Sequence, residues 1–208
     1  MNNLVENKKA LSRIWNLLSA LFCQPEEDLH GNKEVYNELV RSLQIIEDEI
    51  TSDVKSLLNH YESAGQQSVL IEYTRLFIGP FKTVAPPYSS VYLSKDGTVF
   101  GDETQQVLDF YHQSGVEFDF SINELPDHIA VELEFMHYLS SHEINEIESG
   151  NIEKAEVLFN SYKIFLNKHM KRWAPMFCDR IISGANNDYY RTLAICFKSF
   201  VESQADQS

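Results

Sequence analysis

Apolar residues that return every three or four positions constrain the fold of this chain more than any other feature. Near the N-terminus this set consists of Leu11, Ile14, Trp15, Leu18, Leu21 and Phe22. Residues at this spacing lie on one face of an α-helix. The pattern therefore predicts a first amphipathic helix that ends near Pro25.

The same spacing predicts helices along most of the remaining sequence. Before residue 80 it covers 35–46, 54–61 and 69–77, and Gly79-Pro80 must end the last of these because proline cannot continue a helix. Beyond residue 100 the predicted helices are 103–114 behind an Asp102 cap, 126–142 with Pro126 at the first helical position, 151–170, 173–184 and 188–201. We expect an all-α fold, a single globular helical bundle of about eight or nine helices over residues 1–208.

Two segments interrupt the helical pattern. Residues 79–102 are rich in Gly and Pro yet carry apolar side chains, which predicts a long irregular loop buried by the core or by a partner. Residues 116–122 alternate apolar and polar side chains, which predicts a short extended stretch too isolated to imply a sheet. Residues 116–125 are thus a candidate hinge between an N-terminal lobe, 1–115, and a C-terminal lobe, 126–208.

The negative charge is concentrated in one part of the sequence. The chain has 31 acidic and 17 basic residues, and the 58 residues between Lys95 and Lys154 contain 14 of the acids and no Lys or Arg. This balance argues against nucleic-acid binding, which relies on basic residues. A surface of one sign favours oppositely charged partners, so we expect a basic peptide or protein, with a merely solubilising face as the alternative.

Several other classes of protein lack support in the sequence. The longest apolar run, 17–23, is far shorter than the roughly 18–20 residues of a membrane span, and no secretory signal is evident, so we expect a cytoplasmic protein. Cys23, Cys178 and Cys196 fit neither a disulfide framework nor a CxxC site, and we interpret them as reduced core thiols.

Motifs that carry catalysis are also missing from the sequence. One usable ExxH half-motif, Glu134 to His137, does not make a metal site, and no phosphate-binding glycine loop or GxSxG elbow occurs. We therefore expect no enzyme. The segment 123–128, Asn-Glu-Leu-Pro-Asp-His, is typical of an acidic start to a helix. The helix dipole would favour Asp127 in the first turn, and His128 beside it could change charge between about pH 5 and 8.

Two motifs in this order carry a resemblance to a known family. They are 76–80, Leu-Phe-Ile-Gly-Pro, followed by 86–93, Pro-Pro-Tyr-Ser-Ser-Val-Tyr-Leu; and 124–128, Glu-Leu-Pro-Asp-His, followed by 133–136, Leu-Glu-Phe-Met. The chain resembles the TorD/DmsD/NarJ family of chaperones that mature bacterial molybdenum redox enzymes, and is more similar to the TorD and DmsD branches. The resemblance implies an all-helical protein that binds the twin-arginine leader or apo form of a molybdoenzyme, delaying export until the cofactor is inserted.

The resemblance also implies a leader-binding region. It maps onto Leu76, Phe77, Gly79, Pro80, Phe81, Pro86, Pro87, Tyr88, Ser90, Glu124, Pro126, Asp127 and His128, with Phe81 and Tyr88 where some relatives have Trp. A leader with two guanidinium groups and an apolar helix needs carboxylates beside an apolar groove. We expect a charge reversal at Asp127 to weaken leader binding and to leave the helices intact.

Alternatives remain open at this point. An acidic helical adaptor would recognise another basic partner without needing paired arginines, and a metal enzyme would use His112, His128, His137 and His142. By resemblance, a guanine nucleotide or molybdopterin precursor can bind such proteins, although no site for either is identifiable, and the chain can be a monomer or a domain-swapped dimer. The sequence does not name the client enzyme.

Overall fold

The computed structural model describes residues 2–46, 51–79, 83–122 and 124–206, which form an all-α fold, as predicted. The first half contains α1 Asn2–Leu21, α2 Glu27–His30, α3 Lys33–Ile45, α4 Thr51–Ala64, α5 Gln66–Tyr73 with a π-helical turn Thr74–Ile78, α6 Ser89–Leu93 and α7 Asp102–Gln113. The second half contains α8 Ile129–Glu148, α9 Ile152–Phe165, a π-helical turn Leu166–Met170, α10 Lys171–Gly184 and α11 Asp188–Asp206. Within the described ranges, no helix combines the length and hydropathy needed to cross a bilayer.

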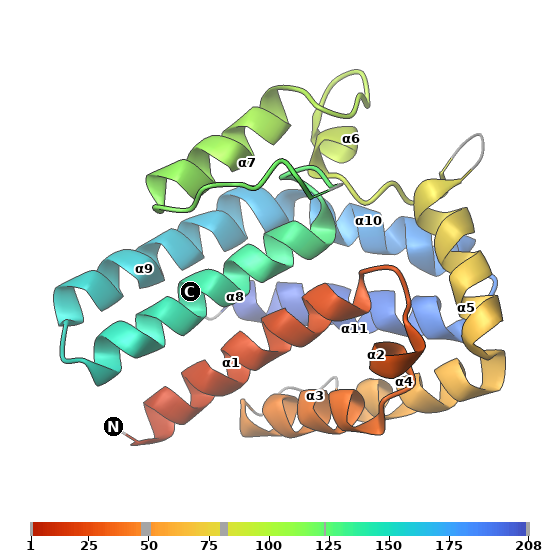
Figure 1. Ribbon diagram of the computed structural model, residues 1–208, viewed down its shortest axis with the longest axis horizontal. Coiled ribbons are helices and arrows are strands. Elements are labelled where there is room, and N and C mark those ends of the chain that lie inside the picture. Colours follow the sequence, from red (N-terminus) through yellow and green to blue (C-terminus); the bar gives the residue numbers. More distant parts are fainter. Residues whose placement is uncertain (1, 47–50, 80–82, 123, 207–208) are drawn as a thin grey trace.

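Helices from the two ends of the chain pack against one another (Figure 1). α1 lies between α8 and α3, and α4 packs on α11, which in turn lies along α10. α6 and α7 form a separate upper layer over α9 and α10, and α5 crosses one end of the bundle. The predicted lobes 1–115 and 126–208 are therefore joined by broad helix-to-helix contacts.

One hydrophobic cluster holds these helices together. Trp15 on α1 is fully buried and its ring lies 4.7 Å from that of Phe200 on α11, between centroids. Phe22 contacts Phe177 on α10 in the same way at 5.7 Å. Large aromatic side chains bury about 150–250 Å² each, so these contacts bury apolar surface where the C-terminal end of the chain, α10 and α11, meets α1 and the residue after it.

The predicted loop at 79–102 contains the short helix α6, so it is less irregular than expected. Its sequence is too short for a periodic pattern, and the helix forms where Ser89 and Ser90 are buried between other elements. Gly79 ends the preceding π-helical turn, and its φ of +54° is positive, which favours glycine. α2 was also missed, for the same reason of length.

The break predicted before Trp173 is wrong. α9, the π-helical turn and α10 follow one another without interruption, and Pro175 lies inside α10. Proline removes one backbone donor and crowds the preceding turn. The prediction took this local cost as a helix boundary, but Trp173 and Phe177 on either side are fully buried, and that packing favours the continuous helix.

The starts of two helices differ from the prediction. The N-cap of α7 is Gly101 rather than Asp102, which lies in the first turn. Pro126 and Asp127 precede α8, whose N-cap is His128. Residues 116–122 form no strand. Among the described residues, β-type backbone pairing is limited to one isolated antiparallel bridge between Tyr88 and His128.

Cys178 and Cys196 are buried core thiols, as predicted, but Cys23 is exposed. Cys23 lies two residues beyond Leu21, the last residue of α1, and so is not on the core-facing side of that helix. Its Sγ lies 3.4 Å from the Ser19 carbonyl oxygen.

Candidate functional site

The two motif segments, 86–93 and 124–128, meet in space. The Ser89 backbone N–H donates to the Asp127 carbonyl oxygen over 3.0 Å, and the Ile129 N–H donates to the Pro87 carbonyl oxygen over 2.8 Å. These two hydrogen bonds flank the Tyr88–His128 bridge. The bridge fixes the start of α6 against the start of α8 and presents Tyr88 and His128 together.

Asp127 lies inside this junction and has no exposed surface. Its Oδ2 accepts a hydrogen bond of 2.9 Å from the Ser90 backbone N–H at the start of α6. Tyr111 on α7 closes the junction from another side, since its hydroxyl donates to the Pro126 carbonyl oxygen over 2.8 Å. Asp127 therefore acts as a structural tie between elements, and a charge reversal there would disturb the fold as well as the pocket beside it.

Tyr88, Glu124 and His128 form a polar group at the edge of the junction. The Tyr88 hydroxyl donates to Glu124 Oε2 over 3.2 Å, and His128 Nε2 lies 3.8 Å from the same oxygen. Burial raises the pKa of Tyr88 to about 12, with the Glu124 carboxylate adding to the effect. Burial also raises the pKa of Glu124, against the hydrogen bond from Tyr88.

His128 is a neutral capping residue. Its Nδ1 accepts a hydrogen bond of 3.2 Å from the Ala130 N–H, which satisfies a free donor at the start of α8. Burial lowers the pKa of His128 to about 4, because the charged ring would lose its solvation. The expected change of charge between pH 5 and 8 is therefore wrong.

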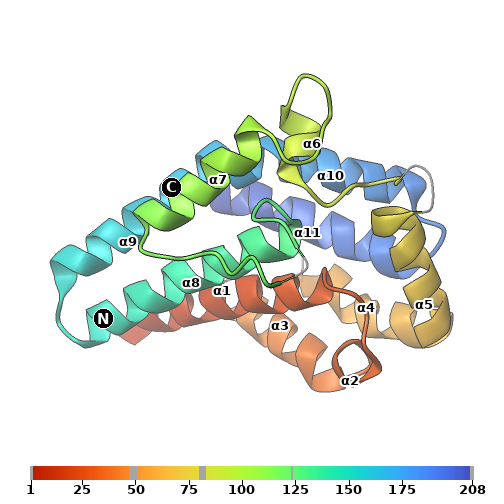
Figure 2. The same cartoon turned by 45° about the horizontal axis from the view of Figure 1, so that its top comes forward.

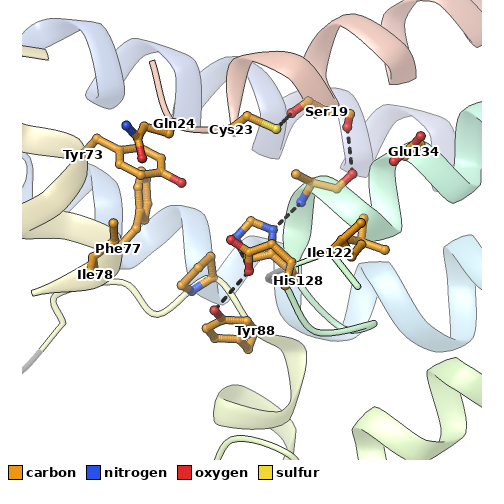
Figure 3. Close-up of a pocket in the computed structure, with 14 residues that line it drawn as sticks. Ser19, Cys23, Gln24, Tyr73, Phe77, Ile78, Tyr88, Ile122, His128 and Glu134 are labelled. Carbon is orange, nitrogen blue, oxygen red and sulfur yellow. Dashed lines mark hydrogen bonds and ion pairs between the residues drawn. The ribbon is translucent and has the colours of Figure 1, made fainter. Parts of the chain in front are cut away.

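A pocket of about 360 Å³ opens beside this group. Figure 3 shows its apolar wall, Tyr73, Phe77 and Ile78, on one side, and Ile122 and Glu134 on the other. The apolar wall comes from the end of α5 and the π-helical turn after it. π-helical turns are rare and recur at functional sites.

The end of α1 closes the pocket. Ser19, Cys23 and Gln24 line it, and the Ser19 hydroxyl donates to the Ala130 carbonyl oxygen on α8 over 2.7 Å (Figure 3). The pKa of the Cys23 thiol is raised, first by desolvation and then by the carboxylates of Glu124 and Glu134. Both carboxylates therefore act on the same space, and both side chains are exposed.

The structure brings together only part of the predicted site. Five of the predicted residues line the pocket: Phe77, Pro87, Tyr88, Glu124 and His128. Four are buried outside the pocket lining: Ser90, Pro126 and Asp127 in the supporting junction, and Leu76 in the π-helical turn. Gly79 and Pro86 are half-buried outside the pocket lining, whereas Pro80 and Phe81 lie outside the described residues.

Sequence reasoning missed nine residues that line the pocket: Ser19, Cys23, Gln24, Tyr73, Ile78, Ile122, Ala130, Val131 and Glu134. Three of them carried a signal. Ile78 belongs to the 76–80 motif. Tyr73 lies one helical turn before Phe77, and Glu134 belongs to the 133–136 motif. The residues of α1 carried none, because only the packing of α1 on α8 brings them to the pocket.

A second buried acid, Glu132, supports the start of α8. Its side chain has no exposed surface, and Trp173 Nε1 donates to its Oε2 over 2.9 Å. Burial raises the pKa of Glu132 well above its ordinary value, and the nearby Asp127 carboxylate raises it further. Burial of Glu132 in the core therefore favours its neutral form.

The histidines that a metal site would use are dispersed. His137 Nδ1 lies 2.9 Å from the Ser12 hydroxyl, His142 Nδ1 lies 2.9 Å from the Tyr138 carbonyl oxygen, and His112 faces Glu117. Across the described part of the chain, no three His, Cys, Asp or Glu side chains are grouped as metal ligands.

Similar proteins agree with the motifs. The family model of the nitrate reductase delta subunit matches residues 44–179. The Tat proofreading chaperone DmsD of Salmonella typhi is 29% identical over 133 residues, which cover 64% of this chain and 58% of the relative. A Haemophilus influenzae protein named as a probable Tat proofreading chaperone DmsD is 29% identical over 150 residues, covering 71% of this chain and 66% of the relative.

The fold has a counterpart among solved structures. A crystal structure of an Archaeoglobus fulgidus protein assigned to redox enzyme maturation superposes with a TM-score of 0.59 at 22% identity, covering 92% of this chain and 93% of that one. The chain matches less than two thirds of the length of the two DmsD relatives. The family model nevertheless spans most of the sequence, and the chain belongs to the nitrate reductase delta subunit family, with DmsD chaperones among its relatives.

Proposed function

We propose that this chain is a cytoplasmic chaperone, without catalysis of its own, for a molybdenum-cofactor oxidoreductase. It binds the twin-arginine leader or the apo form of that enzyme, assists cofactor insertion and delays export until maturation. The names of the two DmsD relatives support this function.

The observation that carries the proposal is the composition of the pocket. Two exposed carboxylates, Glu124 and Glu134, line the same pocket as the apolar wall of Tyr73, Phe77 and Ile78. No Lys or Arg is among the described residues that line this pocket. Guanidinium groups form their strongest hydrogen bonds with carboxylates. A ligand with adjacent arginines and an apolar continuation matches both parts of the lining.

The pocket also revises which acids meet the arginines. Asp127 is fully buried and committed to the Ser90 N–H, so we assign the contact to Glu124 and Glu134. Binding an arginine would lower the raised pKa of Glu124, since an opposite charge favours the ionised carboxylate.

Titration calorimetry tests this function. The protein is titrated with leader peptides from the molybdoenzymes of its host, each paired with a version in which the two arginines are lysines. We expect one leader to bind and its lysine version to bind more weakly, because lysine cannot make the bidentate contact. Equal affinity for the two versions would refute arginine recognition and favour an adaptor for another basic partner.

A pair of variants separates the pocket from general charge effects. Glu124→Gln combined with Glu134→Gln removes both charges and keeps hydrogen-bonding groups of similar size, so we expect about tenfold weaker binding of the leader. Glu62→Gln is the control, because Glu62 is exposed on α4 and lines none of the pockets described in this article. Equal effects of the double variant and the control would argue against this pocket.

A further inference from the structure

Three pockets follow one another along a single face of α8. The first, described above, includes Ala130, Val131 and Glu134. A second, of about 290 Å³, shares Ile122, Val131 and Glu134 with it and continues to Tyr138. A third, of about 470 Å³, begins at Tyr138 and continues to His142 and Glu146. Neighbouring pockets share lining residues, and we call the three together the α8 groove.

The walls of the α8 groove come from two other parts of the chain. Residues 116–122 line the second pocket, and Figure 2 shows this segment running back from the end of α7 alongside α8. α9 lines the third pocket through Val157 and Leu158. Apolar side chains that line the groove remain open to solvent, among them Ile122 at 44% and Val157 at 65% exposed. The groove therefore presents apolar surface with no covering element among the described residues.

The length of the groove fits a helical ligand. From Ala130 to Glu146, α8 rises by about 24 Å at roughly 1.5 Å per residue. An apolar helix of about 16 residues has the same length. Amphipathic and apolar helices commonly bind in grooves of this kind through side chains spaced by one turn.

The charges along the groove give it a direction. The first and second pockets are lined by acids, namely Glu117, Asp119, Glu124 and Glu134. The third pocket, at the far end, is lined by two acids, Glu146 and Glu153, and by one base, Lys154. The N-terminus of a helix carries partial positive charge and its C-terminus partial negative charge. A basic N-terminal end is thus favoured at the first two pockets, which are lined by four acids and, among the described residues, by no Lys or Arg, rather than at the third.

We propose that the α8 groove binds the apolar segment that follows the arginine pair of the ligand, as a helix of about 16 residues running from Glu124 and Glu134 toward Lys154. This inference rests on the proposed function and adds the position, length and direction of the bound segment. It makes Val157 on α9 part of the binding surface, at the end of the groove that lies about three turns of α8 beyond Glu134.

Peptides of two lengths test the groove. The short peptide contains the arginine pair and the next four or so residues, and the long peptide continues through about 16 apolar residues. We expect the long peptide to bind at least about tenfold more tightly, because it buries additional apolar surface. Val157→Glu should remove most of that gain and leave the short peptide unaffected.

Ile71→Glu is the matched control, because Ile71 is 62% exposed on α5 and lines none of the three pockets. It should change neither affinity. Thermal unfolding checks that both variants fold, as their exposure predicts. Sedimentation of the free protein checks whether a second copy covers the groove.

Each result decides between the inferences. If the short peptide binds through its arginines but the long one binds no more tightly, or if Val157→Glu leaves the gain intact, the groove proposal is wrong and the arginine site stands. If neither peptide binds better than its lysine version, both proposals fail. If Val157→Glu turns a dimer into a monomer, the groove is a self-association surface and the helix-binding proposal is overturned.

Discussion

Replacing His128 by Asn is expected to flatten the dependence of stability on acid pH. The ring of His128 is 3% exposed, and its Nδ1 must stay unprotonated to accept the Ala130 N–H. The pKa of the folded-state ring is lowered from 6.5 to about 4 by burial. The unfolded chain therefore takes up a proton on His128 at a higher pH than the folded chain does.

The size of the effect follows from the two pKa values. A pKa difference of about 2.5 corresponds to about 3 kcal/mol at roughly 1.4 kcal/mol for each tenfold change in the proton equilibrium. Because the folded pKa is the lower one, this contribution to the free energy of unfolding is present above pH 6.5 and is lost as the pH falls toward 4. Wild-type protein should lose about 3 kcal/mol over this window from His128 alone.

Asn is the suitable replacement, because its side-chain oxygen can cap α8 and does not titrate. The variant loses the ring contact with Tyr88, whose centroid lies 5.3 Å from that of His128. We expect it to be less stable by about 1–2 kcal/mol near pH 7. Between pH 7 and 4 the gap should close and then reverse, since the variant escapes the proton uptake.

Urea unfolding at pH 7, 6, 5 and 4 measures this difference, provided that the m-value stays constant. At each pH, the free energy of unfolding of the variant is subtracted from that of the wild type. This difference removes the titration of other groups, such as His169, whose pKa is also lowered to about 4. His112→Asn is the control at an exposed histidine and should leave the difference flat. Wild-type and His128→Asn curves that fall in parallel between pH 7 and 4 would refute the buried neutral cap.

Two further substitutions test the support of the pocket. Asp127→Asn should lower the free energy of unfolding by about 1–3 kcal/mol, because it disturbs the hydrogen bond from the Ser90 N–H at a fully buried site. Urea unfolding would detect this loss, and an unchanged midpoint would contradict the structural role. Glu132→Gln keeps an acceptor for Trp173 Nε1 but cannot ionise. Folding raises the pKa of Glu132, so its contribution to the free energy of unfolding is fully present below about pH 4.5 and is lost as the pH rises above that value. The variant should lack this decline. A decline of the same size in both proteins would show that Glu132 does not titrate with folding.

Local sequence patterns were sufficient for most of the helices. The spacing of Leu11 to Phe22 predicted α1, and Asn151 was placed correctly at the start of α9. Such patterns act within one or two turns, which is the range over which periodicity and capping work. Pro175 shows the limit, because the cost of an internal proline is local whereas the packing that offsets it is not.

The candidate site was predictable only in part, for a geometrical reason. The two motifs were expected to act together, and the Tyr88–His128 bridge joins them. The role of each acid was not predictable, because Glu132 and Glu134 are two residues apart on a helix and point to nearly opposite sides. Only the packing of α1 and α9 against α8, with the hydrogen bond from Trp173 on α10 to Glu132, decides which side is the core.

The sequence by itself determined the helical class, the concentration of acids between residues 96 and 153, and the two motifs, because these depend on composition and near-neighbour spacing. Tertiary structure alone decided that Asp127 and Glu132 are buried while Glu124 and Glu134 face the pocket. It also decided that residues from α1, α5 and α8 share one cavity. Burial and charge environment arise from contacts between distant segments, and a linear pattern contains no measure of those contacts.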